Sequence, residues 1–160
     1  MQANRLEAHV VARNLLARAG PASLATVAAD GSPFASYVLS APGRDGWPIL
    51  LLSRLAVHTS NLLRDSRASL LLVHEPGHGA GPAAAERLTL VGRALEHADQ
   101  ASAGAAFLAH HPEAARYAGF ADFRYFAFVA STAHVVAGFG VIAKLSVAQL
   151  GSAPNQHSVL

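Results

Sequence analysis

Residues 48–74 read PILLLSRLAVHTSNLLRDSRASLLLVH, and the fold prediction depends on the pattern within them. Pro48–Ser53 and Ala68–His74 are short runs of large apolar residues, a pattern typical of buried strands. Between them, Ala56–Arg64 predicts a short helix. The stretch therefore predicts two buried strands connected by a single small helix.

The residues before this stretch predict a helix and a hairpin. Apolar residues recur at helical spacing from Leu6 to Leu15, and Gly20-Pro21 ends the pattern. Ser23–Ala29 and Phe34–Ser40 are β-rich runs separated by the turn sequence Asp30-Gly31-Ser32-Pro33. We therefore expect one amphipathic helix followed by a pair of antiparallel strands.

The second half of the chain alternates strands and helices in the same way. We expect, in order, a loop at Pro76–Ala85, a long strand at Glu86–Glu96, a helix at Ala98–His110, a short helix from Pro112 to Gly119, and strands at Phe123–Val129 and Ala133–Ala137 joined by a turn at Ser131-Thr132. Many short strands with few helices predict a mainly β protein with peripheral helices (α+β), built on a closed antiparallel barrel. We expect one domain over residues 1–145 and a frayed tail over 146–160.

The composition excludes several classes of protein. Of the 160 residues, 52% are hydrophobic and 14% are charged, a balance that disordered tails do not have. The net charge is +2, and the sequence has no stripe of basic residues interleaved with aromatic ones. We therefore do not expect nucleic acid as a partner. The chain has no cysteine, which excludes thiolate chemistry and cysteine-ligated metals.

Two segments bear on membranes and targeting. Charged residues interrupt the first eighteen positions, so we predict no signal peptide there. Tyr125–Ala143 has no charged residue and is long enough to span a bilayer. However, Ser131, Thr132 and His134 lie in its middle, where polar groups are costly in hydrocarbon. We therefore predict a soluble, cytoplasmic protein that is not inserted in a membrane.

His74-Glu75-Pro76-Gly77-His78 matches the zinc motif H-E-x-x-H. That motif binds zinc because a helix places both imidazoles on one face. Proline and glycine occupy its two middle positions here and disfavour a helix. We therefore predict no metal site, and no nucleophile elbow or glycine-rich nucleotide loop is evident elsewhere.

The segment from Ser36 to Asn61 is the best candidate for a binding site. Ser36 and Ser53 lie on the predicted strands, and polar residues 58–61 gather at the start of the short helix. A helix start offers free N–H groups and a positive dipole end, which suit a phosphate. The alternative is that Thr59 or Ser60 caps the helix, and the spacing alone favours capping.

Residues 52–62 and 68–73 resemble the FMN-binding split barrel of pyridoxamine 5′-phosphate oxidase relatives, and more narrowly the HugZ-type haem-utilisation branch. Three further segments agree with that branch in the same order: Arg87–Arg93, His111–Ala114 with Phe120–Phe123, and Gly138–Gly140. The resemblance covers residues 11–145.

The resemblance implies a six-stranded antiparallel split barrel and a homodimer that binds FMN in a cleft at the subunit interface. Carried over by position, the implied cofactor-binding residues are Ser36, Tyr37, Val38, Leu52, Ser53, His58, Thr59, Asn61 and, from the partner subunit, Arg87. His58 and Thr59 stand where the oxidases usually have Arg-Lys. This exchange removes positive charge opposite a phosphate, so we expect weaker flavin binding.

Three functions follow as hypotheses. The first is an FMN-binding flavoprotein that acts as an oxidoreductase on a small-molecule substrate, with no catalytic residue identified. The second is haem binding or haem degradation, which requires an axial ligand, usually histidine. The third is a non-catalytic flavin-binding protein. A homodimer is expected in each case, because 14% charged residues are too few to solvate every face of an apolar barrel.

Overall fold

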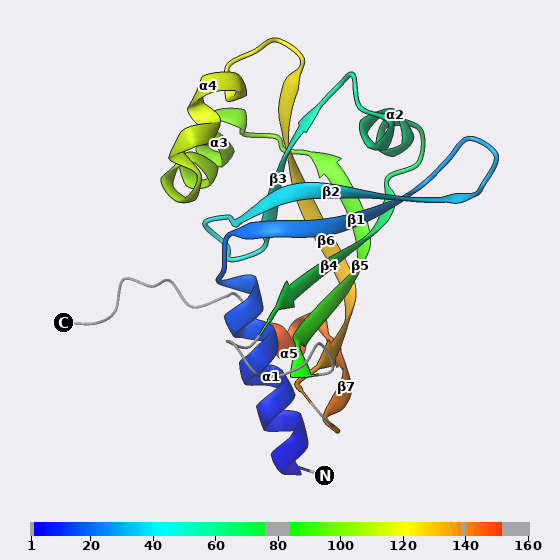
Figure 1. The fold of residues 1–160 in the computed structure, drawn as a ribbon, viewed down its shortest axis with the longest axis vertical. Helices are drawn as coiled ribbons and strands as arrows, with labels where there is room; N and C mark the ends of the chain where they lie inside the picture. The colour runs from blue at the N-terminus through cyan, green and yellow to red at the C-terminus, as the bar shows by residue number, and fades with distance from the viewer. Residues whose placement is uncertain (1, 76–83, 139, 152–160) are drawn as a thin grey trace.

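The computed structural model describes residues 2–75, 84–138 and 140–151, with side chains from residue 4 onward (Figure 1). Its elements are α1 (Gln2–Leu16), β1 (Gly20–Val27), β2 (Pro33–Pro42), β3 (Pro48–Ser53), α2 (Val57–Arg64), β4 (Arg67–His74), β5 (Glu86–Glu96), α3 (Gln100–His110), η2 (Pro112–Ala114), α4 (Ala115–Ala118), β6 (Phe123–Val136), β7 (Ile142–Ser146) and α5 (Val147–Leu150). Most predicted elements in the described ranges are present.

The strands form a closed antiparallel barrel. Their order is β3-β2-β1-β4-β5-β6, and pairing of β3 with β6 closes the ring, while β7 extends the sheet beyond β6. Each inward residue alternates with an outward one, so Leu24, Leu70, Leu88 and Leu90 are fully buried inside the barrel. The predicted six-stranded barrel with peripheral helices is confirmed.

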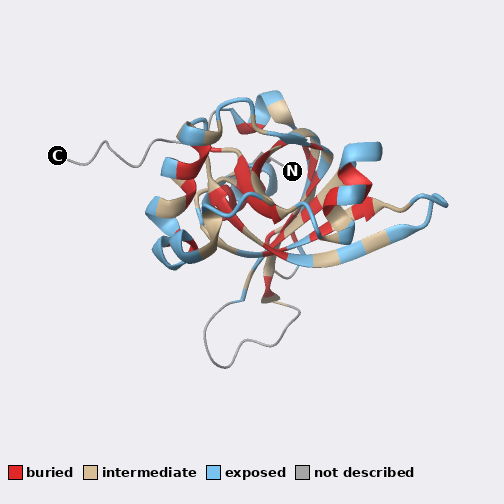
Figure 2. Ribbon diagram, turned by 90° about the horizontal axis from the view of Figure 1, so that it is seen from above, coloured by how far each residue is buried: buried red, intermediate tan, exposed pale blue. Residues whose placement is uncertain are grey.

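The helices close the two ends of the barrel. Figure 1 shows α1 and α5 at one end and α2, α3 and α4 at the other. One face of α1, including Val11 and Leu15, joins the core inside the barrel. Phe107 of α3 is the centre of a second core outside β2 and β3. Figure 2 shows the buried residues toward the middle of the fold and exposed residues on the outer sides of the helices.

The prediction of two strands joined by a turn at Ser131-Thr132 is wrong. β6 is one strand, and the register with β5 shifts between Val91 and Gly92, leaving Ser131 as a β-bulge. The Ser131 hydroxyl donates to the Val91 carbonyl at 2.9 Å. Ser131 therefore forms the bulge and Thr132 pairs with Val91, so the strand continues instead of reversing.

The end of the described chain is more regular than expected. β7 pairs with the second half of β6 and was not predicted. Ser146 and Gln149 then form a capping box at the start of α5, and Leu150 is buried. Residues 152–160 of the expected tail lie outside the described residues, as do residues 76–83 of the expected loop. None of the described helices is long and apolar enough to cross a membrane.

Candidate functional site

A pocket lies where β2 and β3 separate. The two strands pair only at Ser40↔Leu50, Ala41↔Ile49 and Pro42↔Pro48. Before Ser40, β2 pairs with β1 alone, and after Leu50, β3 pairs with β6 alone. The resulting gap, which we call the split pocket, has a volume of about 250 Å³ and is lined by five of the implied cofactor residues: Tyr37, Val38, Leu52, Ser53 and His58.

Aromatic side chains from outside the barrel form the other wall of the split pocket. They are Phe107 of α3, Tyr117 of α4 and Phe123 at the start of β6. The Tyr117 and Phe123 rings lie 5.2 Å apart and are tilted by 51°, a stable arrangement for two rings. These residues lie far along the chain from β2 and β3, and none of them was assigned to the site from the sequence.

The hydroxyl of Ser53 is already engaged. It donates to Oδ2 of Asp122 at 2.6 Å and accepts from the backbone N–H of Leu55 at 3.1 Å. The backbone N–H of Arg54 donates to the Asp122 carbonyl at 2.7 Å. Asp122 therefore fixes the corner between β3 and α2. It lies within Phe120–Phe123, a segment that supported the resemblance but was given no role in the site.

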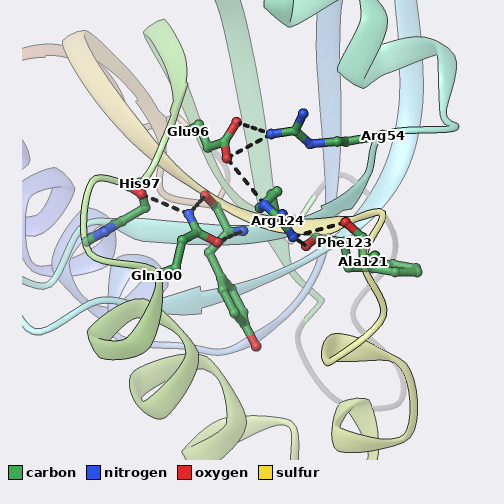
Figure 3. A network of polar contacts seen from close by, with 8 residues as sticks. Arg54, Glu96, His97, Gln100, Ala121, Phe123 and Arg124 are labelled. Atoms are coloured by element: carbon green, nitrogen blue, oxygen red, sulfur yellow. Dashed lines mark hydrogen bonds and ion pairs between the residues drawn. The ribbon is translucent and has the colours of Figure 1, made fainter.

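Nearby cations are held by another carboxylate. Figure 3 shows Glu96 accepting from Arg54 at 3.0 Å, with Arg124 at 3.5 Å from the same group. Arg124 also donates to the carbonyls of Ala121 and Phe123. Among the described residues, no lysine or arginine lines the split pocket. Asp122 does not line the pocket itself, but its carboxylate accepts from Ser53, which does, and so places an acidic group behind the pocket wall.

His58 is half-buried at the first turn of α2. Burial lowers the pKa of its imidazole below the ordinary value of 6.5, because desolvation disfavours the charged form. Burial therefore favours the neutral form of His58, which makes it a weaker source of positive charge than the Arg-Lys pair of the oxidases.

The remaining implied residues of this region contact the protein. The Ser36 hydroxyl donates to the Leu24 carbonyl at 3.3 Å. Asn61 is buried and donates to Thr26 Oγ1 at 3.0 Å. Thr59 is buried, and its hydroxyl has no hydrogen-bond partner among the described residues. These three side chains do not line the split pocket.

The expectation that Thr59 or Ser60 caps this helix is wrong. α2 begins at Val57 after Ala56, and no side chain of the described residues caps it. Thr59 and Ser60 are therefore the third and fourth helical residues, beyond the capping position. Thr59 points into the protein and Ser60 into solvent.

Arg87 lies at the opposite end of the barrel from α2, near the start of β5, where it pairs with Val73 and Val136. Because the next residue, Leu88, is fully buried inside the barrel, Arg87 points outward. Its Nε atom is buried and has no hydrogen-bond partner in the described part of the chain. Within one chain, Arg87 and the split pocket are not brought together.

The outward surface around Arg87 is an extended, partly apolar face of the sheet. We call it the open face and define it by Ala25, Ser69, Leu71, Val73, Arg87, Thr89, Val91, His134 and Val136. His134 pairs with Thr89, so it is a diagonal neighbour of Arg87 on the same surface. Val73 is 45% exposed and Val91 is 40% exposed. Apolar surface of this kind is typical of a binding face.

A groove of about 770 Å³ continues from the open face toward the β1–β2 turn. Val91 and Val129 contribute apolar surface, and Arg67 and Arg93 lie at its polar edge. Arg67 is paired with Asp65, and Arg93 donates to the Ser66 hydroxyl at 2.9 Å. The volume of the groove is within the range of about 300–1,000 Å³ that is usual for small-molecule and cofactor sites.

The H-E-x-x-H sequence does not lie on a helix where it is described. His74 is the last residue of β4, and its Nδ1 accepts a hydrogen bond from Arg18 Nη1 at 2.6 Å. The motif from Pro76 onward lies outside the described residues.

Comparison with protein families decides the relationship: a model of the CREG β-barrel family matches residues 3–150. The chain belongs to this family. The CREG β-barrel chain is also 41% identical, over 98 residues, to the chloroplastic non-canonical heme oxygenase HOZ of Arabidopsis thaliana. That match covers 60% of this chain and 29% of the plant protein, so the chain spans less than a third of this curated relative.

Two solved structures resemble the CREG β-barrel chain over most of its length. A heme binding protein from Mycobacterium smegmatis is 31% identical with a TM-score of 0.82, and the match covers 89% of this chain and 59% of that one. A Clostridium acetobutylicum protein of the pyridoxinephosphate oxidase family, related to general stress protein 26, has a TM-score of 0.67 at 14% identity, covering 89% and 96%. The second likeness shows the fold alone. The resemblance to split barrels with haem-utilisation relatives is confirmed.

The split pocket of this CREG β-barrel chain does not fit a flavin phosphate. A phosphate needs donors and positive charge. The Ser53 hydroxyl hydrogen is committed to Asp122, and burial favours the neutral form of His58. The open face, in contrast, combines apolar surface with the guanidinium of Arg87, whose buried Nε has no hydrogen-bond partner among the described residues.

Proposed function

We propose that this chain binds haem on its open face. The observation that carries the proposal is the position of His134 beside Arg87, whose buried Nε lacks a hydrogen-bond partner among the described residues. Imidazole is the usual protein ligand of haem iron. A guanidinium with an unused donor is suited to a haem propionate, because charge-assisted pairing compensates its burial.

The relatives support haem over other anionic cofactors. The plant relative is called a heme oxygenase and the mycobacterial structure a heme binding protein. In the chain itself, Val73 and Val91 flank Arg87 and Thr89 and provide apolar surface for a porphyrin. Bound haem would supply a redox-active iron, and the protein's contribution is to ligate it through His134 and orient it through Arg87.

We further propose that the protein is a homodimer in which a second copy covers the open face. Cofactor sites are concave and enclose most of their ligand, whereas the open face is one side of a sheet. A second copy related by two-fold symmetry provides the opposite wall with the same apolar residues. Val129, 54% exposed at the edge of the adjoining groove, extends the apolar surface available to that contact.

An FMN-dependent oxidoreductase is the second candidate. The gathering of Tyr37, Ser53 and His58 around the split pocket supports it. Asp122 beside Ser53 opposes it. Titration of the purified protein with FMN tests this candidate separately, since quenching of flavin fluorescence reports binding without any assay of turnover.

Haem titration with and without His134 tests the main proposal. We expect the wild-type protein to give a Soret band of a histidine-ligated haem, and His134→Ala to shift that band and to lose the low-spin ferric signal in electron paramagnetic resonance. His110→Ala, which removes an exposed histidine of α3, is the matched control and should leave both spectra unchanged. Wild-type spectra in His134→Ala, or the absence of a Soret shift in the wild type, would overturn the proposal.

Sedimentation of the same samples tests the dimer. We expect about twice the chain mass of 16.6 kDa for the apoprotein. Val129→Lys places a charge in the apolar contact and should shift the protein toward the monomer. A wild-type protein that stays monomeric with haem bound would contradict the two-copy site.

A further inference from the structure

The split pocket has the character of a site for a single aromatic ring. Phe107, Tyr117 and Phe123 form one wall, and the volume of about 250 Å³ is small for a dinucleotide or a macrocycle. The unpaired edges of β2 and β3 bound the gap, and a free strand edge presents backbone N–H and C=O groups. The pocket therefore combines stacking surfaces with backbone groups that orient a ligand.

The polar side of the split pocket accepts hydrogen bonds. A serine hydroxyl has one hydrogen and two lone pairs. In Ser53 the hydrogen goes to Asp122, and one lone pair accepts from the N–H of Leu55. The remaining lone pair can accept from a ligand donor, but the hydroxyl has nothing left to donate to an anion.

The charges near the split pocket also favour a ligand that donates hydrogen bonds. Asp122 places a carboxylate 2.6 Å from the Ser53 oxygen. Arg54 directly follows Ser53 in the chain, but its guanidinium is paired with Glu96 at 3.0 Å (Figure 3). The pocket thus has aromatic rings on one wall and, behind Ser53, a carboxylate. Both favour a cation, because ring faces carry negative potential.

From this combination, and independently of haem binding, we propose that the split pocket binds a small aromatic amine and rejects phosphorylated or carboxylated ligands. The ring lies among Phe107, Tyr117 and Phe123. The ammonium group donates to Ser53 and is stabilised by Asp122. The pocket, lined by five of the residues that the resemblance implies for a flavin, would thus take a ligand opposite in charge to a flavin phosphate.

Two probes with similar rings and opposite charges test this proposal by calorimetry or by chemical-shift perturbation. They are tyramine, a cation at neutral pH, and phenyl phosphate, an anion. We expect tyramine to bind at least about tenfold more tightly than phenyl phosphate, a difference of about 1.4 kcal/mol. Asp122→Asn should reduce that ratio to near one, whereas Asp30→Asn at the exposed β1–β2 turn makes the same charge change elsewhere and should keep it.

Further variants keep the result interpretable if Asp122→Asn unfolds. Ser53→Ala retains the carboxylate and removes the acceptor, so tyramine should bind several-fold more weakly. Tyr117→Leu removes a ring and should weaken tyramine without favouring phenyl phosphate. Tighter or equal binding of phenyl phosphate by the wild type overturns the proposal, and so does no binding of tyramine at millimolar concentrations.

Discussion

Gly92 on β5 and Val129 on β6 approach so closely that there is no room for a side chain at position 92. A Cβ at Gly92 would overlap the carbonyl oxygen of Val129 and lie 2.9 Å from the Cα of Ala130. The approach occurs at the register shift that makes Ser131 a bulge. Gly92 therefore permits the bend by which β6 leaves β3 and continues beside β7.

Gly92→Ala should destabilise the protein, because the added methyl meets backbone that cannot move without breaking the ladder. We expect a loss of about 1–3 kcal/mol in the free energy of unfolding, measured by urea titration. Gly119→Ala is the control, since a Cβ at that position meets nothing within 4 Å and its φ of −84° suits alanine. Equal stability of the two variants would show that the approach at Gly92 is not constraining.

Asn61→Ala should also lower stability. The buried Asn61 amide donates to Thr26 Oγ1 and accepts from Arg64 at 3.2 Å, so it joins α2 to β1. Its removal leaves the Thr26 hydroxyl without this donor, at a cost of about 1–3 kcal/mol in the free energy of unfolding. Ser60→Ala, at an exposed position of the same helix, should change stability by less than about 0.5 kcal/mol. A larger loss for Ser60→Ala than for Asn61→Ala would contradict this role.

The sequence predicted the barrel well where apolar runs determine it, and less well where a partner strand does. Leu50, Leu70 and Leu88 lie in runs whose burial is evident from their own pattern. The polar pair Ser131-Thr132 has the composition of a turn, and only the pairing of β6 with Val91 and Gly92 of β5 shows that Ser131 is a bulge. β7 is short and pairs only with β6, so its own residues gave little signal.

The residues of the site were predictable where a motif fixes their position, and not where a distant part of the chain does. Motif positions on β2, β3 and the first turn of α2 identified residues such as Ser53 and His58 that line the split pocket. The direction of Thr59 and Asn61 depends on where α2 begins, and it begins at Val57 without a side-chain cap. The partner of Ser53, Asp122, lies 69 positions away, so spacing could not indicate that the Ser53 hydroxyl donates to a carboxylate.

Arg87→Ala tests the assignment of the open face. Removing the guanidinium should weaken haem binding by about tenfold or more, the size expected for a lost charge-assisted hydrogen bond. The sedimentation coefficient of the apoprotein should be unchanged, because the variant keeps the apolar residues of that face. Arg87→Lys retains charge without the forked donors and should recover only part of the affinity. Full affinity in Arg87→Ala would contradict the assignment.

His58 should make the protein less stable in mild acid. Burial lowers the pKa of the folded imidazole below its ordinary value of 6.5. The unfolded chain then takes up the proton at a higher pH than the folded one, so stability falls as the pH decreases below about 6.5. His58→Gln should lose less stability than the wild type between pH 7 and about pH 5, measured as thermal midpoints. An identical loss in both proteins would contradict this account.

The seam between β3 and β6 has a consequence for how the chain folds. Ser53 pairs with Phe123, and its hydroxyl bonds Asp122 at a separation of 69 positions. Hairpins such as β1–β2 close short loops, whereas between β3 and β6 the chain passes through β4, β5 and α3. Contacts between residues far apart in the sequence close a long loop and form slowly. We expect the seam to form last. Until then the nascent barrel exposes two strand edges beside Leu51 and Tyr125, the point at which an unfinished chain is most exposed to aggregation or to a chaperone.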